Sequence, residues 1–298
     1  MKKFGLYLIL TILFFGCETV SYVADDEKLF FTTDISIKNI TEDSLTVIFS
    51  VNKASRCHLY YCDGYNTDSV LVQEFRQNHE ITLNDLYAGI HYQIEVRLTE
   101  FYDSLEITSI GITAATAENN FSRGWQAFRD GEFETALSFL NTYNQSNPHD
   151  PWTISSQGWC LLQTGSYQEA REKFLYCDTL LASEPLHLLG LTLLEQITEN
   201  YNEALTFGES LLLLHPQWQF LYFTQYNSNL ARLILAETSL IMGDFEKSIN
   251  LLDQLLPENI FYNNSESWVL EGVKYNNLEA FIIAALNFLK SEFYSSFP

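Results

Sequence analysis

A period of 34 residues in the second half of the chain constrains its fold more than any other feature. Apolar residues recur about every 3.6 positions within each copy, which predicts helices, and one such unit cannot bury its apolar face alone. The first two copies share six positions: Gly124 and Gly158, Trp125 and Trp159, Gly131 and Gly165, Phe133 and Tyr167, Ala136 and Ala170, and Leu140 and Phe174. A third copy continues the register, and a fourth follows about ten residues late, which predicts an insertion near 217–228. Residues 117–256 are therefore expected to form a stack of helical repeats.

The turns expected between paired helices carry the segments GEFETAL, GSYQEAR, ENYNEAL and GDFEKSI. They resemble the tetratricopeptide repeat family, in which Gly makes the turn, a small Ala lets the helices approach, and Pro follows the second helix. Glu199 departs from the pattern at the third turn Gly, and Ser248 departs at the fourth Ala. The resemblance implies an all-α solenoid over 117–298, with about four repeats and capping helices within 266–294. It also implies a groove that docks another protein.

Between residues 29 and 116 the period of apolar residues is 2. Strict alternation over 45–52 and 92–99 predicts strands with one buried face. Shorter runs bring the expected number to six or seven strands; they lie at 35–40, 57–62, 70–75 and 107–112. Turn-forming residues separate them at 41–44, 63–66 and 84–85. This count and spacing predict a small all-β sandwich.

The segment LNDLYAGIHY at residues 83–92 resembles the corner of a fibronectin type III domain. The resemblance implies that Leu86 fills the core and that the hydroxyl of Tyr92 caps a turn. Phe49 stands where the family usually carries Trp, and Ala88 replaces the usual Pro. The family is a spacer and adhesion module, so the resemblance implies no catalytic residue here.

The N-terminus has the organisation of an export signal. Lys2 and Lys3 precede an apolar run over 4–15, which is followed by Gly16 and Cys17. Twelve residues of helix span about 18 Å, whereas a bilayer core is about 30 Å thick, so a membrane span is disfavoured. The sequence predicts a signal peptide over residues 1–16.

Cys17 directly after a small residue resembles the lipobox of bacterial lipoproteins, with Phe14 at the place that usually holds Leu. The resemblance implies a lipid on Cys17, a linker over 17–28, and a place in the bacterial cell envelope at the outer membrane. An ordinary cleaved signal and an uncleaved anchor remain as alternatives.

The formal net charge of −22 disfavours binding to nucleic acid or to an anionic membrane surface, because both require cationic patches. The acidity is consistent with solubility of an exported protein. A cationic partner is the alternative.

Motifs for catalysis and cofactor binding are missing from the sequence. The six His are scattered, and GxSxG, P-loop and GxGxxG patterns do not occur. The five Cys include no CxxC pair, and Cys57 and Cys62 lie ~16 Å apart along an extended strand, too far for a disulfide. Spacing at 63–68 lacks the phasing of a calcium loop and predicts a turn. We expect no enzyme, cofactor or metal; a catalytic site dispersed over the fold is the alternative.

An aromatic row is the candidate binding site. The repeat register places it on the first helices, which line the concave face, where aromatic side chains can anchor a peptide or a sugar. The row comprises Phe121, Trp125, Phe128, Trp152, Trp159 and Leu162. The alternative is ordinary packing; we expect Trp125 and Trp159 to be exposed and stacked on each other, and Trp152 to be packed. A second aromatic cluster over 218–226 is expected to fold over the groove as core.

The sequence thus predicts an envelope lipoprotein with two domains, a fibronectin type III-like sandwich over 29–116 and a tetratricopeptide solenoid over 117–298. Its predicted function is a scaffold that binds a protein or peptide partner, while lipid on Cys17 holds it at a membrane. Capture of surface glycans is the alternative function.

Overall fold

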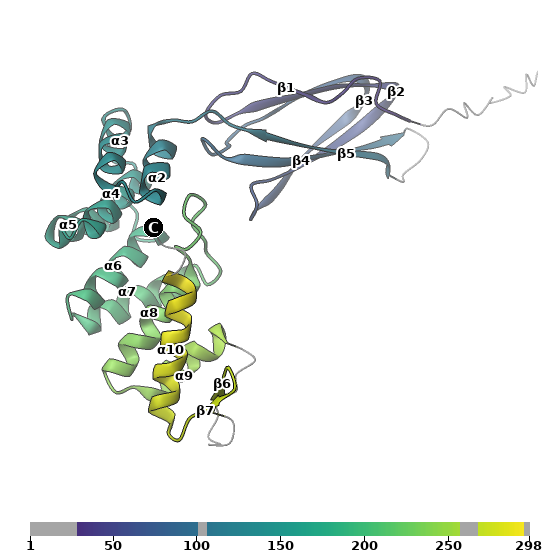
Figure 1. Ribbon diagram of the computed structural model, residues 1–298. Coiled ribbons are helices and arrows are strands. Elements are labelled where there is room, and N and C mark those ends of the chain that lie inside the picture. Colours follow the sequence, from purple (N-terminus) through teal and green to yellow (C-terminus); the bar gives the residue numbers. More distant parts are fainter. Residues whose placement is uncertain (1–28, 101–105, 257–267, 295–298) are drawn as a thin grey trace, which may run out of the picture.

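The computed structural model describes residues 29–100, 106–256 and 268–294. It consists of a β-sheet region followed by an arc of helices (Figure 1). The predicted signal peptide, Cys17 and the linker lie outside the described residues. No helix in the described ranges is both long and apolar enough to cross a membrane.

The β-region is one antiparallel sheet that curls on itself. Its strands are β1 (Ser36–Lys38), β2 (Leu45–Cys62), β3 (Thr67–Leu83), β4 (His91–Glu100) and β5 (Glu106–Ala115). The described residues of this region therefore form five strands in one curled sheet, instead of the six or seven strands of the expected sandwich. The predicted runs at 45–52 and 57–62 are two halves of β2, and the run at 70–75 continues to the end of β3.

A bend in β2 allows one sheet to enclose a core. Before the bend, residues 45–50 pair with β1 and β3, and after it residues 57–62 pair with β3 and β4. The register with β3 shifts between Ser50 and Cys57, as at a β-bulge, which bends a strand and increases its twist. The alternating apolar residues thereby face inward, with Leu45, Val47, Phe49, Leu59, Ile94 and Val96 almost fully buried.

The corner predicted at 83–92 is present. The hydroxyl oxygen of Tyr92 accepts a hydrogen bond from the backbone N–H of Tyr87 at 2.8 Å. Burial is the main cause that raises the pKa of Tyr92 to about 12. Leu86 is buried beside it, as expected. The predicted turn at 63–66 is also present, because the Asp63 carboxylate accepts hydrogen bonds from the backbone N–H groups of Tyr65 and Asn66.

The helical region is a tetratricopeptide-like solenoid of four helix pairs (Figure 1). The second helices of the first three pairs start at residues 133, 167 and 201, which confirms the 34-residue period. The predicted insertion lies between the third and fourth pairs. The pairs are α2 (Asn120–Arg129) with α3 (Phe133–Ser146), α4 (Pro151–Gln163) with α5 (Tyr167–Leu180), α6 (Pro185–Ile197) with α7 (Tyr201–Leu214), and α8 (Ser228–Ile241) with α9 (Phe245–Leu255).

The end of the stack differs from the expected set of capping helices. Among the described residues, a short hairpin of β6 (Val269–Leu270) and β7 (Val273–Lys274) precedes one helix, α10 (Leu278–Tyr294). Buried Phe281, Ile282 and Ala285 pack α10 into a cluster shared with α8 and α9. In the part of the chain that the structure describes, α10 and Leu270 of the hairpin therefore cover the last repeat.

Small residues at the repeated positions permit the close packing of paired helices. A Cβ added at Gly124 would lie 2.8 Å from Leu140, and one added at Gly158 would lie 2.6 Å from Phe174. Real Cβ atoms essentially never come this close, so a larger residue at either position would displace the side chain of Leu140 or Phe174. Packing thus explains the two glycines that the 34-residue period places within the first helices of the pairs, Gly124 and Gly158.

The two departures from the repeat pattern have different structural solutions. Glu199 adopts φ of 63°, close to the 77–80° of the three turn glycines, although this left-handed conformation disfavours residues with a Cβ. Ser248 is fully buried, and its hydroxyl donates to the carbonyl oxygen of Ala236 at 2.8 Å. Serine therefore replaces alanine without an unpaired polar atom, whereas Glu199 retains backbone strain.

Candidate functional site

The insertion between α7 and α8 determines which parts of the concave face remain accessible. Residues 215–227 form a loop closed by a bridge between Gln219 and Asn227 and by a 2.8 Å hydrogen bond from the N–H of Phe220 to the carbonyl of Tyr226. The loop reaches back to α2, α4 and the sheet (Figure 1). It brings an aromatic cluster onto the first two repeats.

Aromatic rings of this loop fill the groove at the predicted anchors. Tyr226 stacks on Trp159 with ring centroids 3.9 Å apart, and Phe220 lies 4.6 Å from Trp125. Tyr226 also contacts Trp125 edge-on at 6.1 Å, so the loop tyrosine bridges the two tryptophans. The predicted direct stacking of Trp125 on Trp159 is replaced by this arrangement.

The indole N–H groups of both tryptophans are satisfied within the protein. Trp125 Nε1 donates to Ser156 Oγ at 2.9 Å, and Trp159 Nε1 donates to the carbonyl oxygen of Leu186 at 3.0 Å. Buried indoles normally find such partners. Both side chains therefore behave as core residues.

The exposure predicted for the aromatic row is wrong at its main residues. Trp125 and Trp159 are 1% and 0% exposed, whereas Trp152, expected to be packed, is 37% exposed. The physical reason is the loop, which covers the groove as expected for the 218–226 cluster but leaves the N-terminal end of α4 open. The other members of the row, Phe121, Phe128 and Leu162, are also buried.

An open cleft lies between the sheet and the first repeat, next to Trp152. Its volume is about 830 Å³, within the usual range for ligand sites. Turns of the sheet form one wall, and α2, the end of α3, the start of α4 and the loop form the other. Residues from all these elements line it: Glu42, Asp43, Tyr65, Asn66, Tyr87, Phe121, Tyr143, Asn147, Asp150, Trp152, Trp218, Phe220 and Tyr222 are among them.

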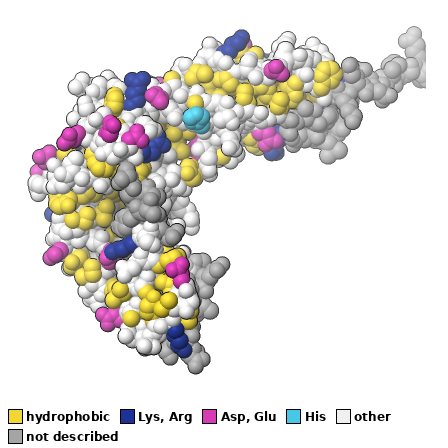
Figure 2. Space-filling view, viewed as in Figure 1, with side chains coloured by type: hydrophobic (Ala, Val, Ile, Leu, Met, Phe, Trp, Pro, Cys, Tyr) yellow, Lys and Arg dark blue, Asp and Glu magenta, His cyan; other side chains and the backbone are white. Residues whose placement is uncertain are grey.

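The cleft combines exposed aromatic rings with negative charge. Tyr87 is 54% exposed and Tyr65 is 52% exposed; both belong to turns of the sheet, and they line the cleft together with Trp152. Among the residues that line the cleft, three are acidic and none is basic. Elsewhere, acidic side chains are scattered over the helical part of the face shown in Figure 2. The cleft therefore offers apolar contact surface within a negative field.

Direct contacts between the two regions fix the floor of the cleft. The hydroxyl of Tyr222 donates to the carbonyl oxygen of Ala88 at 3.0 Å, and the N–H of Gly89 donates to the carbonyl of Ala117 at 3.0 Å. Burial raises the pKa of Tyr222 above its ordinary value. Gly89 has φ of 68°, and a Cβ there would lie 3.0 Å from Ser122 of α2. The sheet and the solenoid are thus in tight contact beside the cleft.

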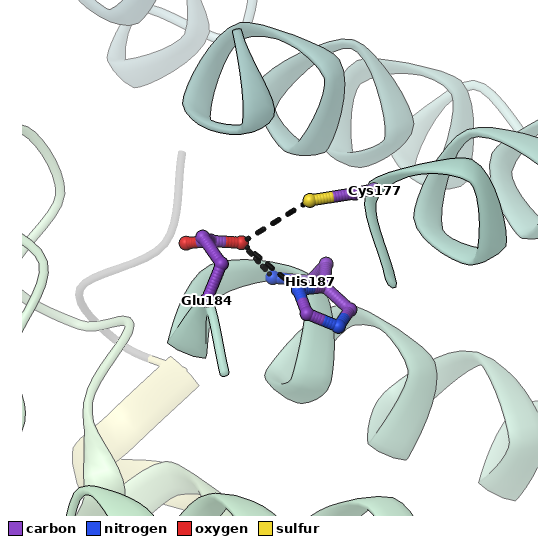
Figure 3. Close-up of side chains that lie close together, drawn as sticks. All are labelled: Cys177, Glu184 and His187. Carbon is purple, nitrogen blue, oxygen red and sulfur yellow. Dashed lines mark hydrogen bonds and ion pairs between the residues drawn. The ribbon is translucent and has the colours of Figure 1, made fainter. Parts of the chain in front are cut away.

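A second polar cluster lies inside the solenoid and was not predicted from the sequence. Cys177, Glu184 and His187 converge from α5 and the start of α6 (Figure 3). Their ligand-type atoms all lie within 4.8 Å of one another, and all three residues are buried. Burial, with a smaller effect of Glu184, raises the pKa of the Cys177 thiol to about 12. The sequence signal was Glu-x-x-His, preceded seven residues earlier by Cys.

Comparisons with known proteins give likeness of fold only. No protein-family model and no curated protein matches the chain. Among solved structures, MamA from Desulfovibrio magneticus RS-1 is 16% identical, with 59% of this chain and 86% of that chain covered and a TM-score of 0.41. A thermophilic TPR protein of Thermus thermophilus is 17% identical, with 59% and 80% covered and a TM-score of 0.40.

A third solved structure, the first TPR of Spaghetti (RPAP3), is bound to an HSP90 peptide. It is 14% identical, with 42% of this chain and 93% of that chain covered and a TM-score of 0.37. All these TM-scores are low, so the comparisons carry no argument of their own. The tetratricopeptide-like character of the helices is instead inferred from the 34-residue period of the chain and from its helix pairing.

Proposed function

We propose that the protein is an envelope-anchored binding module that takes a segment of a partner protein into the cleft between its sheet and its solenoid. The observation that supports this most is the open cleft of about 830 Å³ beside a groove that the chain fills with its own loop. A partner can reach Trp152 and Tyr87, whereas Trp125 and Trp159 are covered. The proposal involves no catalysis, cofactor or nucleic acid.

The chemistry of the cleft specifies the kind of segment. Exposed aromatic side chains provide anchors of the type that dominate binding energy at interfaces. The carboxylates of Glu42, Asp43 and Asp150 favour a cationic side chain in the same segment. The expected ligand is therefore a peptide segment with Lys or Arg next to an aromatic or large aliphatic residue.

Peptide binding tests this proposal. Peptides with Lys or Arg next to an aromatic residue are titrated into the full chain by calorimetry, and Trp152→Ala should weaken the best binder about tenfold or more. Glu42→Gln should weaken it less and reduce its sensitivity to salt. Tyr167→Ala is the matched control, because Tyr167 is a similarly exposed aromatic residue on α5, away from the cleft. Equal affinities for all four proteins would refute binding in the cleft.

We also propose that lipid on Cys17 anchors the module at the outer membrane, with residues 17–28 as a linker. The Gly16-Cys17 pair after the apolar run supports this. Cys17→Ser should release the protein into the soluble envelope fraction or leave its signal uncleaved. A variant that stays in the membrane fraction with the wild-type mass would show that the anchor is not on Cys17.

The sheet region fits a fibronectin type III-like spacer in this scheme. Its support is the Tyr92 hydroxyl at the N–H of Tyr87, together with the switch of partners along β2 from β1 to β4. As a spacer it would hold the cleft away from the membrane, while its turns contribute one wall of the binding site.

Glycan binding is the second candidate function, and one observation favours it. The exposed ring of Trp152 lies in a cleft also lined by the side-chain amides of Asn66 and Asn147, a combination suited to stacking and hydrogen bonding with sugars. Oligosaccharide binding that is insensitive to salt and lost in Trp152→Ala would favour this function over peptide binding.

A further inference from the structure

Four heteroatoms meet in the interior of the solenoid, where three helices approach one another. Cys177 comes from α5, and Glu184 and His187 come from the start of α6 (Figure 3). Ser155 comes from α4. Ser155 Oγ lies 3.1 Å from Cys177 Sγ and 2.8 Å from Glu184 Oε2. Glu184 Oε2 lies 3.7 Å from Cys177 Sγ and 3.1 Å from His187 Nδ1. All four residues are at most 1% exposed.

Helix capping explains only part of this cluster. Glu184 caps α6, because its carboxylate accepts hydrogen bonds from the backbone N–H groups of Leu186 and His187. Asp150 caps α4 in the same way 34 residues earlier, and there the positions equivalent to Cys177 and His187 hold Tyr143 and Thr153. The thiol and the imidazole are therefore not requirements of the repeat.

The hydrogen-bonding capacity of His187 points to a cation. Its Nε2 lies 3.2 Å from Asp178 Oδ1, and its Nδ1 lies 3.1 Å from Glu184 Oε2. Ionised carboxylates only accept hydrogen bonds, and a neutral imidazole has one N–H. If Nε2–H donates to Asp178, the Nδ1 lone pair faces the Glu184 carboxylate. Two hydrogen-bond acceptors would then face each other with no proton between them. A metal ion bound to Nδ1 and Oε2 removes this conflict, and Asp178 then orients the ring as carboxylates commonly do for metal-binding histidines.

The size and charge of the cluster match zinc. Four of the six separations between these atoms are 2.8 to 3.7 Å, and the atoms of Cys177, Glu184 and His187 lie within 4.8 Å of one another. These spacings suit one ion with zinc bond lengths of about 2.0–2.3 Å. A thiolate, a carboxylate and an imidazole are a donor set suited to Zn²⁺ and unsuited to Ca²⁺ or Mg²⁺. One Zn²⁺ also balances the charges of the Cys177 thiolate and the Glu184 carboxylate, as a buried site requires.

We propose that Cys177, Glu184 and His187 bind one Zn²⁺ ion, with the Ser155 hydroxyl at the fourth corner. On binding, the Cys177 thiol releases its proton to solvent, and the metal–sulfur bond forms. Side chains fill all four coordination positions and the site is buried, as in structural zinc sites. It joins the second repeat to the third, so zinc should stabilise the solenoid.

The metal content of the purified full chain tests this inference. Protein prepared without chelators should contain about one zinc per chain, and Cys177→Ser should contain much less. Cys160→Ser is the matched control, because Cys160 is an equally buried cysteine on α4 outside the cluster. It should keep its zinc.

A second measurement uses the wild-type chain and so does not depend on the folding of a variant. Metal-free protein titrated with Co²⁺ should develop the thiolate charge-transfer band and the visible bands of a tetrahedral site, and Zn²⁺ should displace them and raise the thermal midpoint. Protein without bound zinc whose midpoint does not respond to Zn²⁺, and whose His187 carries protons on both ring nitrogens by NMR, would overturn the inference. In that case an imidazolium between two carboxylates holds the cluster together.

Discussion

The groove and the cleft are both lined by tryptophans of first helices, yet only one of them is open. Phe220 contacts both, with ring centroids 4.6 Å from Trp125 in the groove and 5.9 Å from Trp152 in the cleft. The tryptophan in the groove is 1% exposed, and the one in the cleft is 37% exposed. The same loop thus closes one surface and forms the edge of the other.

This difference shows that repeat register alone does not decide which residues can bind a partner. Register determines the face of a helix on which a side chain lies, and both tryptophans lie on first helices. An insertion of about ten residues then determines what covers that face. Trp152, at the N-terminal end of α4, is only partly covered by Phe220, whereas Trp159, two turns further along the helix, lies under Tyr226.

The largest difference between groove and cleft is expected in the stability lost when each of the two tryptophans of α4 is replaced by alanine. Trp159→Ala removes a fully buried indole and should lower the free energy of unfolding by about 3–5 kcal/mol. Trp152→Ala removes a partly exposed ring and should change it by at most about 1 kcal/mol. Urea denaturation followed by far-UV circular dichroism measures both. Similar losses in the two variants would show that the cleft is as closed as the groove.

The sequence carried enough information for the architecture but too little for the site. Glycine recurs at positions 124 and 158 because a Cβ there would lie too close to Leu140 and Phe174. The same local contact is thus made every 34 residues, and the period is visible in the sequence. The strands were predicted from alternation because every second side chain of a strand faces the core, which is also a local property. The continuity of β2 through its bend was not predicted, because residues 53–56 interrupt the alternation and resemble a turn.

The site itself depends on contacts between residues far apart in the chain. Tyr226 lies 67 positions from Trp159, and no local pattern tells that its ring stacks there. The cluster of Cys177 and His187 was missed for a related reason, since the two residues belong to different repeats and lack a regular ligand spacing. Long-range packing decided both outcomes.

High pH should destabilise the buried core of the helical region, to which Cys160 belongs. Burial raises the pKa of the Cys160 thiol from its ordinary value of 9.0 to about 12. Above pH 9 the unfolded chain therefore binds fewer protons than the folded chain, and stability falls by about 1.4 kcal/mol per pH unit for this thiol until about pH 12. Below pH 9 its contribution is fully present.

The control for this prediction is Cys160→Ala, in which the alkaline loss should be shallower. Cys57 in the sheet should keep its own share, because burial raises the pKa of that thiol to about 12 as well. Denaturation midpoints at pH 8, 9, 10 and 11 compare the two proteins. Parallel curves would indicate that water reaches the Cys160 thiol, contrary to its burial in the structure.

Tyr222→Phe should have a smaller effect, at the contact between the two regions. The change removes the hydrogen bond to the carbonyl of Ala88 and leaves that acceptor buried, which costs about 1–3 kcal/mol. Tyr92→Phe is a matched control within the sheet, because its hydroxyl also pairs with one backbone group. Hydrogen exchange should show faster exchange on both sides of the cleft for Tyr222→Phe and only in the sheet for Tyr92→Phe. Identical exchange patterns would contradict a role of Tyr222 in joining the regions.

The smallest expected effect is at Glu199, far from the loop that separates groove and cleft. Its φ of 63° is strained for a residue with a Cβ, and the side chain is exposed and outside both surfaces. Glu199→Gly relieves the strain and also gives the unfolded chain more freedom, so the net gain in unfolding free energy should be about 0.5–1 kcal/mol. Gly165→Ala, at the equivalent turn with φ of 79°, should lose about 1 kcal/mol. Because neither change touches the cleft, the affinity for a cleft-binding peptide should stay the same in both. A change in that affinity would mean that the turns of the solenoid are coupled to the cleft, and that the loop is not the only element that separates the two regions.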